Sequence, residues 1–445
     1  MCRTKMATKA AEPEPRPTRN AAAAKSRPTP PTTAQRSADA AKHSASAPSS
    51  SDPSTSNPAS SWQTRSLSSQ ASLSGLREYL PENPHIYDFS EVRAATNSFL
   101  AKPYSPSPST PCWRCCLRGR EVIVFQRKLR REIPTARLQV MLSVICRSHH
   151  VSLIKLLGVS ISGGQIYLVY DFVRDGASLA DSLRNPRNPN FTILSTWISR
   201  MRVAADVADG LDYIHNSTGL YMNLVHNHIR SNSIVVTEKP ALCARICHFG
   251  TAELCGEPSA APPLPSPEFA GEITWEDSPT PEPRDLARSR SGTLQFEGVT
   301  GYMAPELPST GVATQQCDVY AFGVVLLELL SGSEPVKFRF DRGRRDLVRT
   351  SVIETATAAV EGGGGGGAAE GRVRAWVDRR LGDSFPVDVA GRLTRLALEC
   401  VRVDPDGRPS MRRVAGKVSR LYLESKRWCD SLRVTEGISL SYGPR

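Results

Sequence analysis

Residues 225–236 read VHNHIRSNSIVV, one of eight short blocks whose order along the chain decides the fold. The other seven follow one another between residues 149 and 411. They are HHVSLIKLLG (149–158), LVYDF (168–172), VAADVADGLDYIH (203–215), ICHFG (246–250), GYMAPE (301–306), CDVYAFGVVLLEL (317–329) and DPDGRPSM (404–411).

The composition favours one large domain with appendages. The chain has 445 residues, of which 40% are hydrophobic, and this is enough for a sizeable core. Its longest apolar stretch, residues 319–330, is shorter than the ~20 residues that a bilayer span needs. The N-terminus carries charges where a signal peptide would have an apolar core. We therefore expect a soluble, intracellular protein.

The 11 cysteines show no spaced framework, which is typical of reduced thiols in a cytosolic compartment. The cluster CWRCC (112–116) holds a single C-x-x-C pair, and a zinc site at ligand spacing would need a second pair. We assign no metal site there.

The N-terminal tail carries half of the chain's excess positive charge. The net charge is +12, and residues 1–70 contain ten lysines and arginines against four acids. Residues 1–80 are rich in Ala, Ser and Pro and have almost no aromatics, so we predict a disordered basic tail. Such a tail is attracted to an anionic membrane surface or an acidic partner. Myristoylation needs glycine at position 2, so only S-acylation of Cys2 remains as an anchor.

Apolar periodicity predicts strands first and helices afterwards. A helix is expected within 87–99, and strands are expected at 121–129 and 165–173. The later helices are expected at 198–215, 315–332, 390–401 and 410–425.

This order indicates an α+β domain in two lobes. The strand-rich lobe is expected over about 85–170, the helix-rich lobe over about 171–425, and a C-terminal tail over 426–445. A Pro/Ser/Glu-rich run at 256–290 and a glycine-rich run at 361–371 are expected to be mobile insertions.

With these elements, the eight blocks resemble the protein kinase family, and more narrowly the plant receptor-like kinases. The segment YDFSEVRAATNSF (87–99) looks like the one that leads into their catalytic domain, and the resemblance runs from about 85 to 425. Within the plant group, the chain is similar to the kinase domains of LysM-type receptor-like kinases. The resemblance implies a bilobal fold with a small β-rich N-lobe and a larger helical C-lobe.

Phosphoryl transfer requires bound phosphates, positioned metal ions and charge stabilisation. The family's glycine-rich loop corresponds to residues 102–116, which contain no glycine and four prolines. Because proline has no N–H to offer a phosphate, we expect no phosphate cover.

The strand at 121–129 matches the family strand that carries a phosphate-binding lysine. Phe125 stands at the lysine position and Ile123 at the small residue above the adenine. Period-2 alternation places both on the nucleotide face and Lys128 on the opposite one. We expect Ile123, Phe125 and Val235 to line the former nucleotide cleft. The family glutamate that orients the lysine corresponds to Leu138 or Gln139, and neither is an acid.

The catalytic and metal-binding positions have changed as well. His228 stands for the base aspartate, Ser233 for the metal-binding asparagine and His248 for the metal-binding aspartate. Magnesium prefers oxygen ligands, and histidine cannot reproduce the electrostatics of a carboxylate base. We therefore assign no catalytic residue and no metal ligand, and we expect ATP binding to be weak or absent and no Mg²⁺ site.

The family's structural residues are retained. Asp318 matches the aspartate that holds the catalytic-loop backbone, and Glu306 and Arg408 match a buried ion pair. His226 and Phe249 match two members of the apolar stack that joins the lobes, and Gly250 follows them in the same motif. Losses confined to chemical positions indicate a maintained, folded domain.

We predict a catalytically inactive pseudokinase that acts as a scaffold or allosteric partner in plant receptor-like kinase signalling. The alternative is an active Ser/Thr kinase in which Asn232, Lys128 or Arg230 take over the missing roles. The expected partners are signalling proteins, including active receptor-like kinases, and no nucleic acid is expected. The expected location is the cytoplasm, with peripheral contact at the plasma membrane through the basic tail.

Two sharper alternatives stay open. His226, His228, Cys247 and His248 lie in adjoining motifs and could together bind zinc. Ser266, Ser278 and Thr280 each precede proline in the 256–290 insertion and are candidate phosphorylation sites.

Overall fold

A computed structural model describes residues 84–104, 111–185, 188–216, 224–259, 301–341, 346–362 and 366–438. The predicted basic tail, the candidate phosphorylation sites and most of the 256–290 insertion lie outside these ranges. Within them, no helix combines the length and apolar character needed to cross a bilayer.

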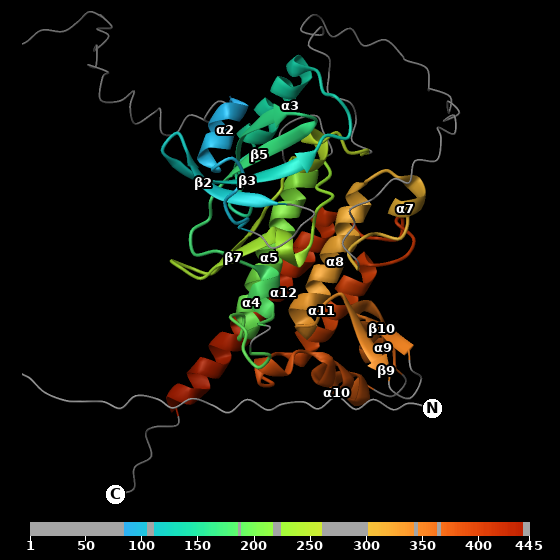
Figure 1. The fold of residues 1–445 in the computed structure, drawn as a ribbon. Helices are drawn as coiled ribbons and strands as arrows, with labels where there is room; N and C mark the ends of the chain where they lie inside the picture. Colours follow the sequence, from blue (N-terminus) through green and yellow to red (C-terminus); the bar gives the residue numbers. More distant parts are fainter. Residues whose placement is uncertain are drawn as a thin grey trace, which may run out of the picture. The chain divides into compact units, whose positions relative to one another are not determined.

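The first part of the described chain forms a five-stranded sheet with the order β1-β4-β5-β3-β2 (Figure 1). β3 lies between β2 and β5 and pairs antiparallel with both. The strands are β1 (His85–Ile86), β2 (Cys112–Leu117), β3 (Arg120–Lys128), β4 (Leu156–Ser162) and β5 (Gln165–Asp171). Helices α2 (Phe89–Ala95) and α3 (Thr135–Arg147) complete this lobe.

Alternation along β3 sends its side chains into two different cores. Val122 and Val124 join the apolar cluster that includes α2. Ile123 and Phe125 join the larger cluster that α3 shares with the helical part of the chain. Lys128, which has the opposite parity, is exposed. The predicted strand parity is therefore correct, because side chains along a strand alternate between its two faces.

Helix α3 lies against the segment that follows His248. A Cβ atom at Gly250 would lie 2.6 Å from the Ile145 side chain, and the φ of Gly250 is +82°, so only glycine fits there. On α3, Leu138 is buried and Gln139 is exposed. Of the two residues that could correspond to the family glutamate, the one that faces the interior is therefore apolar.

The helical lobe is built on α5 (Trp197–Asn216) and α8 (Gln315–Ser331). α5 packs against α12 (Met411–Ile438), and α8 packs against α11 (Val387–Cys400). α8 is apolar nearly all round, as predicted, and it also buries two acids, Asp318 and Glu328. A strand-rich lobe followed by a helical lobe confirms the predicted α+β, bilobal fold (Figure 1).

Shorter elements join these parts. Strands β6 (Ala177–Ser178), β7 (Ile234–Thr237) and β8 (Cys243–Ile246) form a small sheet in the order β6-β7-β8. Strands β9 (Val336–Asp341) and β10 (Asp346–Ser351) form a separate hairpin. The remaining elements are α4 (Leu179–Leu183), η1 (Ser231–Ser233), α6 (Thr251–Leu254), α7 (Leu307–Thr310), α9 (Val352–Glu361), α10 (Gly366–Trp376) and η2 (Arg379–Leu381).

Two predicted boundaries were wrong. α10 begins at Gly366, inside the predicted loop 361–371, because the alanines and the glutamate after the glycine run are good helix formers. α12 continues to Ile438, inside the predicted tail 426–445. Its last part is too polar for the apolar periodicity on which the prediction relied.

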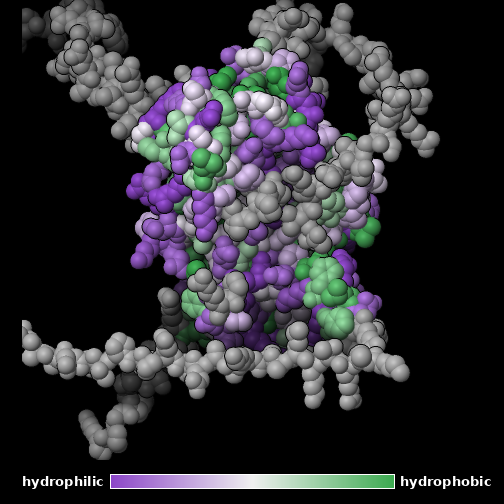
Figure 2. Space-filling view, viewed as in Figure 1, coloured by the Kyte–Doolittle hydropathy of each residue, from purple (hydrophilic) through white to green (hydrophobic). Residues whose placement is uncertain are grey.

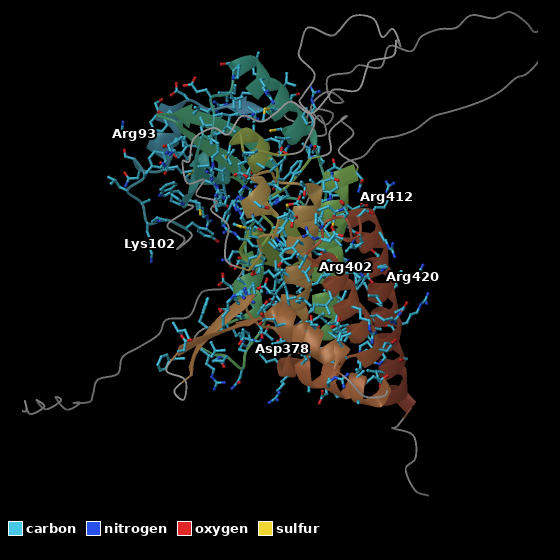
Figure 3. All side chains as sticks on the ribbon, turned by 90° about the vertical axis from the view of Figure 1, so that its right-hand side faces the viewer. Arg93, Lys102, Asp378, Arg402, Arg412 and Arg420 are labelled. Atoms are coloured by element: carbon cyan, nitrogen blue, oxygen red, sulfur yellow. The ribbon has the colours of Figure 1, made fainter. Side chains whose placement is uncertain are left out.

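A buried ion pair fastens the segment that ends at α7 to the end of the domain. The Arg408 guanidinium donates to both carboxylate oxygens of Glu306 at 2.7 Å, and the Arg408 side chain is fully buried. It also donates to the carbonyls of Gln316, Arg402 and Val403. Asp378 makes a second internal pair with Arg200 at 2.6 Å. By contrast, Arg402, Arg412 and Arg420 are exposed and extend outward in Figure 3.

Replacing Arg408 with glutamine should therefore lower the free energy of unfolding by about 3–5 kcal/mol, because Glu306 and three carbonyls lose their donor. Chemical denaturation measures this change. The matched control is Arg174→Gln, which breaks an exposed pair with Glu121 and should cost under about 1 kcal/mol. Equal effects of the two substitutions would contradict a buried, structural role for Arg408.

Candidate functional site between the lobes

The loop at 225–233 is held by one buried carboxylate, that of Asp318. The backbone N–H groups of His226 and Asn227 each donate to it at 2.7 Å, and His215 Nε2 donates at 3.0 Å. Burial would raise the pKa of Asp318, but the hydrogen bond and charge of His215 hold it below its ordinary value. Asn227 adopts a φ of +58°, a conformation that asparagine tolerates better than most residues. Asp318 therefore fixes the path of the loop.

His226 uses both of its ring nitrogens inside the protein. Its Nε2–H donates to the Cys247 carbonyl at 2.9 Å, and its Nδ1 accepts from the His228 backbone N–H at 3.2 Å. The ring is fully buried, and burial lowers the pKa of His226 to about 4. A neutral imidazole whose two nitrogens are engaged in this way has no lone pair left for a metal ion.

His228 faces a carboxylate that the sequence analysis placed in a mobile insertion. His228 Nε2 lies 3.1 Å from Glu257 Oε1, and the Asn227 side-chain amide donates to Glu257 Oε2 at 2.7 Å. Burial would raise the pKa of Glu257, but the charge and hydrogen bond of His228 lower it to about 2. The side chains of His228 and Glu257 are only 18% and 13% exposed. The position of the base aspartate is thus occupied by a paired imidazole.

Ser233 is engaged in its own turn. Its hydroxyl donates to the Arg230 carbonyl at 2.8 Å and accepts from the Arg230 N–H at 3.0 Å. The neighbouring Asn232 is exposed to solvent. The Ser233 hydroxyl is therefore engaged within the loop, and Asn232 faces solvent.

On the opposite side, three aromatic rings meet where phosphate and metal would lie in a kinase-like site. The Phe125 ring lies edge-on to His248, with their centroids 4.5 Å apart, and 5.9 Å from the Tyr170 ring. The Tyr170 hydroxyl donates to the Phe249 carbonyl at 2.9 Å. Such ring pairs contribute about 0.5–1.5 kcal/mol each beyond their buried area. We call Phe125, Tyr170 and His248 the ring cluster.

His248 is a neutral member of this cluster. Burial lowers the pKa of His248 well below its ordinary value, and the charge of nearby Arg127 lowers it further. Its backbone φ is +71°, and its Nδ1 is buried without a hydrogen-bond partner among the described residues. Across the same described ranges, no three His, Cys, Asp or Glu side chains are grouped to hold a metal ion.

Ile123 and Val235 are the other residues predicted for the cleft. Ile123 and Val235 are half-buried and pack against the main core. Arg127, two residues beyond Phe125 on the same face of β3, is buried as well. The surroundings of His248 therefore combine the Phe125 and Tyr170 rings with the charge of Arg127.

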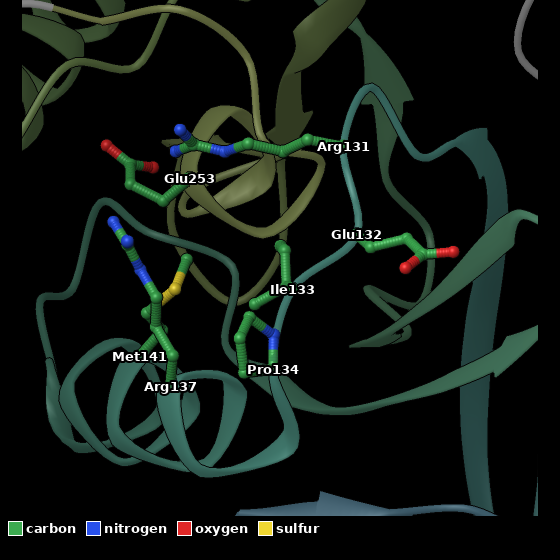
Figure 4. A pocket seen from close by; sticks show the side chains of 7 residues that line it. All are labelled: Arg131, Glu132, Ile133, Pro134, Arg137, Met141 and Glu253. Atoms are coloured by element: carbon green, nitrogen blue, oxygen red, sulfur yellow. The ribbon is translucent and has the colours of Figure 1, made fainter.

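A small cavity of about 60 Å³ lies beside this region, between the turn before α3 and helix α6 (Figure 4). Arg131 and Arg137 extend toward Glu253 in this view. One carboxylate oxygen of Glu253 is buried without a hydrogen-bond partner in the described structure, and burial raises the pKa of Glu253 to about 7. The lining includes no residue of the ring cluster, so this cavity is not the predicted nucleotide cleft.

Sequence reasoning missed two charged residues of the site. Arg127 could have been found, because its parity in β3 equals that of Ile123 and Phe125. Glu257 gave no such signal, since its contact with His228 depends on the path of a segment 29 residues further along the chain. The insertion predicted to begin at 256 begins later, because Pro258 accepts a hydrogen bond from Ala313 and Ser259 forms a β-bridge with it.

Comparison with known proteins identifies the family of this chain. A family model described as the protein kinase domain matches residues 123–418. LysM domain receptor-like kinase 3 of Arabidopsis thaliana is 30% identical over 348 residues, which cover 78% of this chain and 48% of that protein. Protein LYK5 of the same plant is 27% identical over 362 residues, or 81% of this chain and 47% of the relative. The chain thus spans about half the length of these curated relatives.

A solved structure shares the fold. It is the pseudokinase domain of BIR2, described as an immune regulator of the RLK/Pelle family, with a TM-score of 0.53 and 20% sequence identity. The match covers 78% of this chain and 93% of that one.

The raised pKa of Glu253 should make the stability of the protein depend on pH. Its folded value of about 7 exceeds the ordinary 4.5, so the native protein should lose stability as pH rises through that interval. Glu253→Gln, which never ionises, should therefore gain stability relative to the native chain, reaching roughly 3 kcal/mol at pH 8 and vanishing near pH 4.5.

Urea denaturation at a series of pH values measures this difference. Glu132→Gln is the control for net charge, because Glu132 lines the same cavity but is exposed. A Glu253→Gln effect that is equal at pH 5 and pH 8 would contradict the burial of this carboxyl.

Proposed function

Because the chain belongs to the protein kinase family, as its ordered blocks predicted, we propose that it acts without phosphoryl transfer. It serves as a scaffold or allosteric partner for receptor-like kinases. Relatives of this chain include proteins named receptor-like kinases.

The single observation that carries this proposal is the contact of Phe125 with His248 at a centroid distance of 4.5 Å. In an active kinase these two positions hold a lysine ammonium and a carboxylate, which bind phosphate and Mg²⁺. Here two uncharged rings pack against each other. Opening the site for a nucleotide would separate them and expose apolar surface to water, while supplying no oxygen ligand in return.

The base position supports the same proposal. Glu257 is the one carboxylate that approaches His228 among the described contacts, and its two oxygens already accept from His228 and Asn227. A substrate hydroxyl would have to displace one of these donors from a mostly buried acid. That costs free energy, because buried hydrogen-bonded charges are expensive to leave unpaired.

A second candidate function is Ser/Thr phosphorylation through the pair formed by His228 and Glu257. A histidine oriented by a carboxylate is a recurring general base, and their separation of 3.1 Å suits that role. The relocated roles considered from the sequence find less support, because Asn232 and Lys128 are exposed. We place this candidate second because no group of three His, Cys, Asp or Glu side chains that could hold a metal ion occurs in the part of the chain that the structure describes.

The proposed partners are active receptor-like kinases, and the proposed location is the cytoplasmic side of the plasma membrane. The names of the relatives and the positive charge of residues 1–70 support both. A basic segment gains affinity for anionic lipid with each lysine or arginine near the surface.

Thermal denaturation of the full chain with a non-hydrolysable ATP analogue, with and without Mg²⁺, tests the proposal. We expect no metal-dependent rise in the midpoint. A ligand at a hundred times its Kd would add about 2.7 kcal/mol to the free energy of unfolding, which is easily detected. An active receptor-like kinase domain measured in parallel is the positive control.

Transfer of labelled γ-phosphate to a general protein substrate separates the two candidate functions. The proposal predicts no transfer above background. Transfer that Glu257→Gln and His228→Gln both abolish, but that Asn232→Ala leaves unchanged, would instead establish the second candidate.

A further inference from the structure

The hairpin of β9 and β10 presents an unusual surface. Its register pairs Phe340 with Leu347 and Phe338 with Arg349, so these four side chains share one face. Phe338, Phe340 and Leu347 are 61%, 58% and 60% exposed. The opposite face carries Lys337 and Arg339, which are also exposed. Figure 2 shows the resulting apolar patch over this hairpin.

The outer edges of this hairpin lack a hydrogen-bonding strand among the described residues. It is a sheet of only two strands, so each strand has one edge without a hydrogen-bonded neighbour among the described residues. A two-stranded hairpin is marginally stable in water, and a third strand or a packed face is usually needed. Its base is anchored, because the Val352 N–H donates to the Pro335 carbonyl and Ser351 is buried.

The charge of the hairpin selects an acidic occupant. Residues 336–351 contain six lysines and arginines and two aspartates. A second copy of the same hairpin would bring like charges together, which disfavours pairing between two such edges.

One segment of this chain has the complementary pattern. Residues 268–277 read EFAGEITWED, with four acids and no base. Strict alternation places Phe269, Ile273 and Trp275 on one side of an extended chain and the three glutamates on the other. Ile, Thr and Trp favour strands. If the segment lay beside the hairpin as a strand, its apolar side chains would lie on the apolar face of the hairpin. Its glutamates would then lie on the basic face.

The chain also brings this segment to the right place. Residues 260–300 lie outside the described ranges, and the chain re-enters them at Gly301. A Cβ atom at Gly301 would lie 2.7 Å from the Pro335 side chain and 3.1 Å from that of Val336, so this point touches the base of β9. The chain between Asp277 and Gly301 can extend over about 80 Å, against about 20 Å for the length of β9.

We propose that residues 268–277 add to the β9–β10 hairpin as a third strand, with Ile273 and Trp275 on the face of Phe338 and Phe340. The glutamates then lie beside Lys337 and Arg339. This use of the insertion goes beyond the proposed function and does not depend on whether the chain transfers phosphate. Ser266 and Ser278 flank the strand, so phosphate on either would add negative charge beside the basic hairpin.

Amide hydrogen exchange of β9 and β10 in the full chain tests this proposal. The comparison is a variant with the same composition in a different order, Glu272→Ile/Ile273→Glu, which places the isoleucine and Trp275 on opposite sides of an extended chain and so destroys the alternation. The proposal predicts that outward-facing hairpin amides exchange at least tenfold faster in this variant. Glu282→Gln/Asp285→Asn, which removes acids outside the segment, should leave the rates unchanged.

A second experiment removes the segment from the chain and supplies it again as a separate peptide. A chain in which 268–277 is replaced by ten glycines and serines should show the same fast exchange. Adding a peptide of residues 266–280 should restore protection, and a peptide with the rearranged order should not.

Several outcomes would overturn the proposal. Equal exchange in native and rearranged chains would show that the segment is not the occupant. Protection that rises with protein concentration would assign the hairpin to a second copy. Protection that occurs only with vesicles containing phosphatidylserine would assign it to a membrane surface.

Discussion

The buried carboxylate of Asp318 is the interaction on which the rest of the site depends. A carboxylate at 1% exposure is stable only when its oxygens are fully hydrogen-bonded, and here two backbone amides and His215 supply the donors. Those amides belong to His226 and Asn227, so their bonds fix the loop that carries His228. The same constraint would serve an active enzyme or an inactive one, because it determines where the loop lies and not which side chain it presents.

Around that fixed loop, the charged side chains of Glu257 and Arg127 are mostly buried. Glu257 gives the site a carboxylate, but its oxygens are taken up by His228 and Asn227. Arg127 gives it a cation, and that cation helps keep His248 neutral. Phe125 fills the space between the strand and His248. The initial expectation that the acids were simply lost is therefore incomplete. Glu257 is present, in a segment whose position the sequence did not reveal, and it pairs with His228 and Asn227.

The sequence predicted those features that follow from short-range periodicity. The parity of Phe125 and Ile123 was correct because alternation is a local property of a strand, and the buried face of α8 was correct for the same reason. The contact between Glu257 and His228 could not be predicted, since it depends on how two distant segments pass each other. The start of α10 was missed because a run of glycines hid the helix formers that follow it. Local rules thus gave the two-lobed fold, whereas the partners within the site required three-dimensional coordinates.

The central claim is that the described residues of the site between the lobes offer no set of oxygen ligands to a divalent cation. Titration of Mn²⁺, which shares the oxygen preference of Mg²⁺, tests it directly. The full chain is titrated with a non-hydrolysable ATP analogue present, and free Mn²⁺ is followed by electron paramagnetic resonance. The account predicts the same free Mn²⁺ signal with and without protein. A protein-dependent loss that approaches one equivalent, and that disappears when His248 or Glu257 is replaced by alanine, would contradict it.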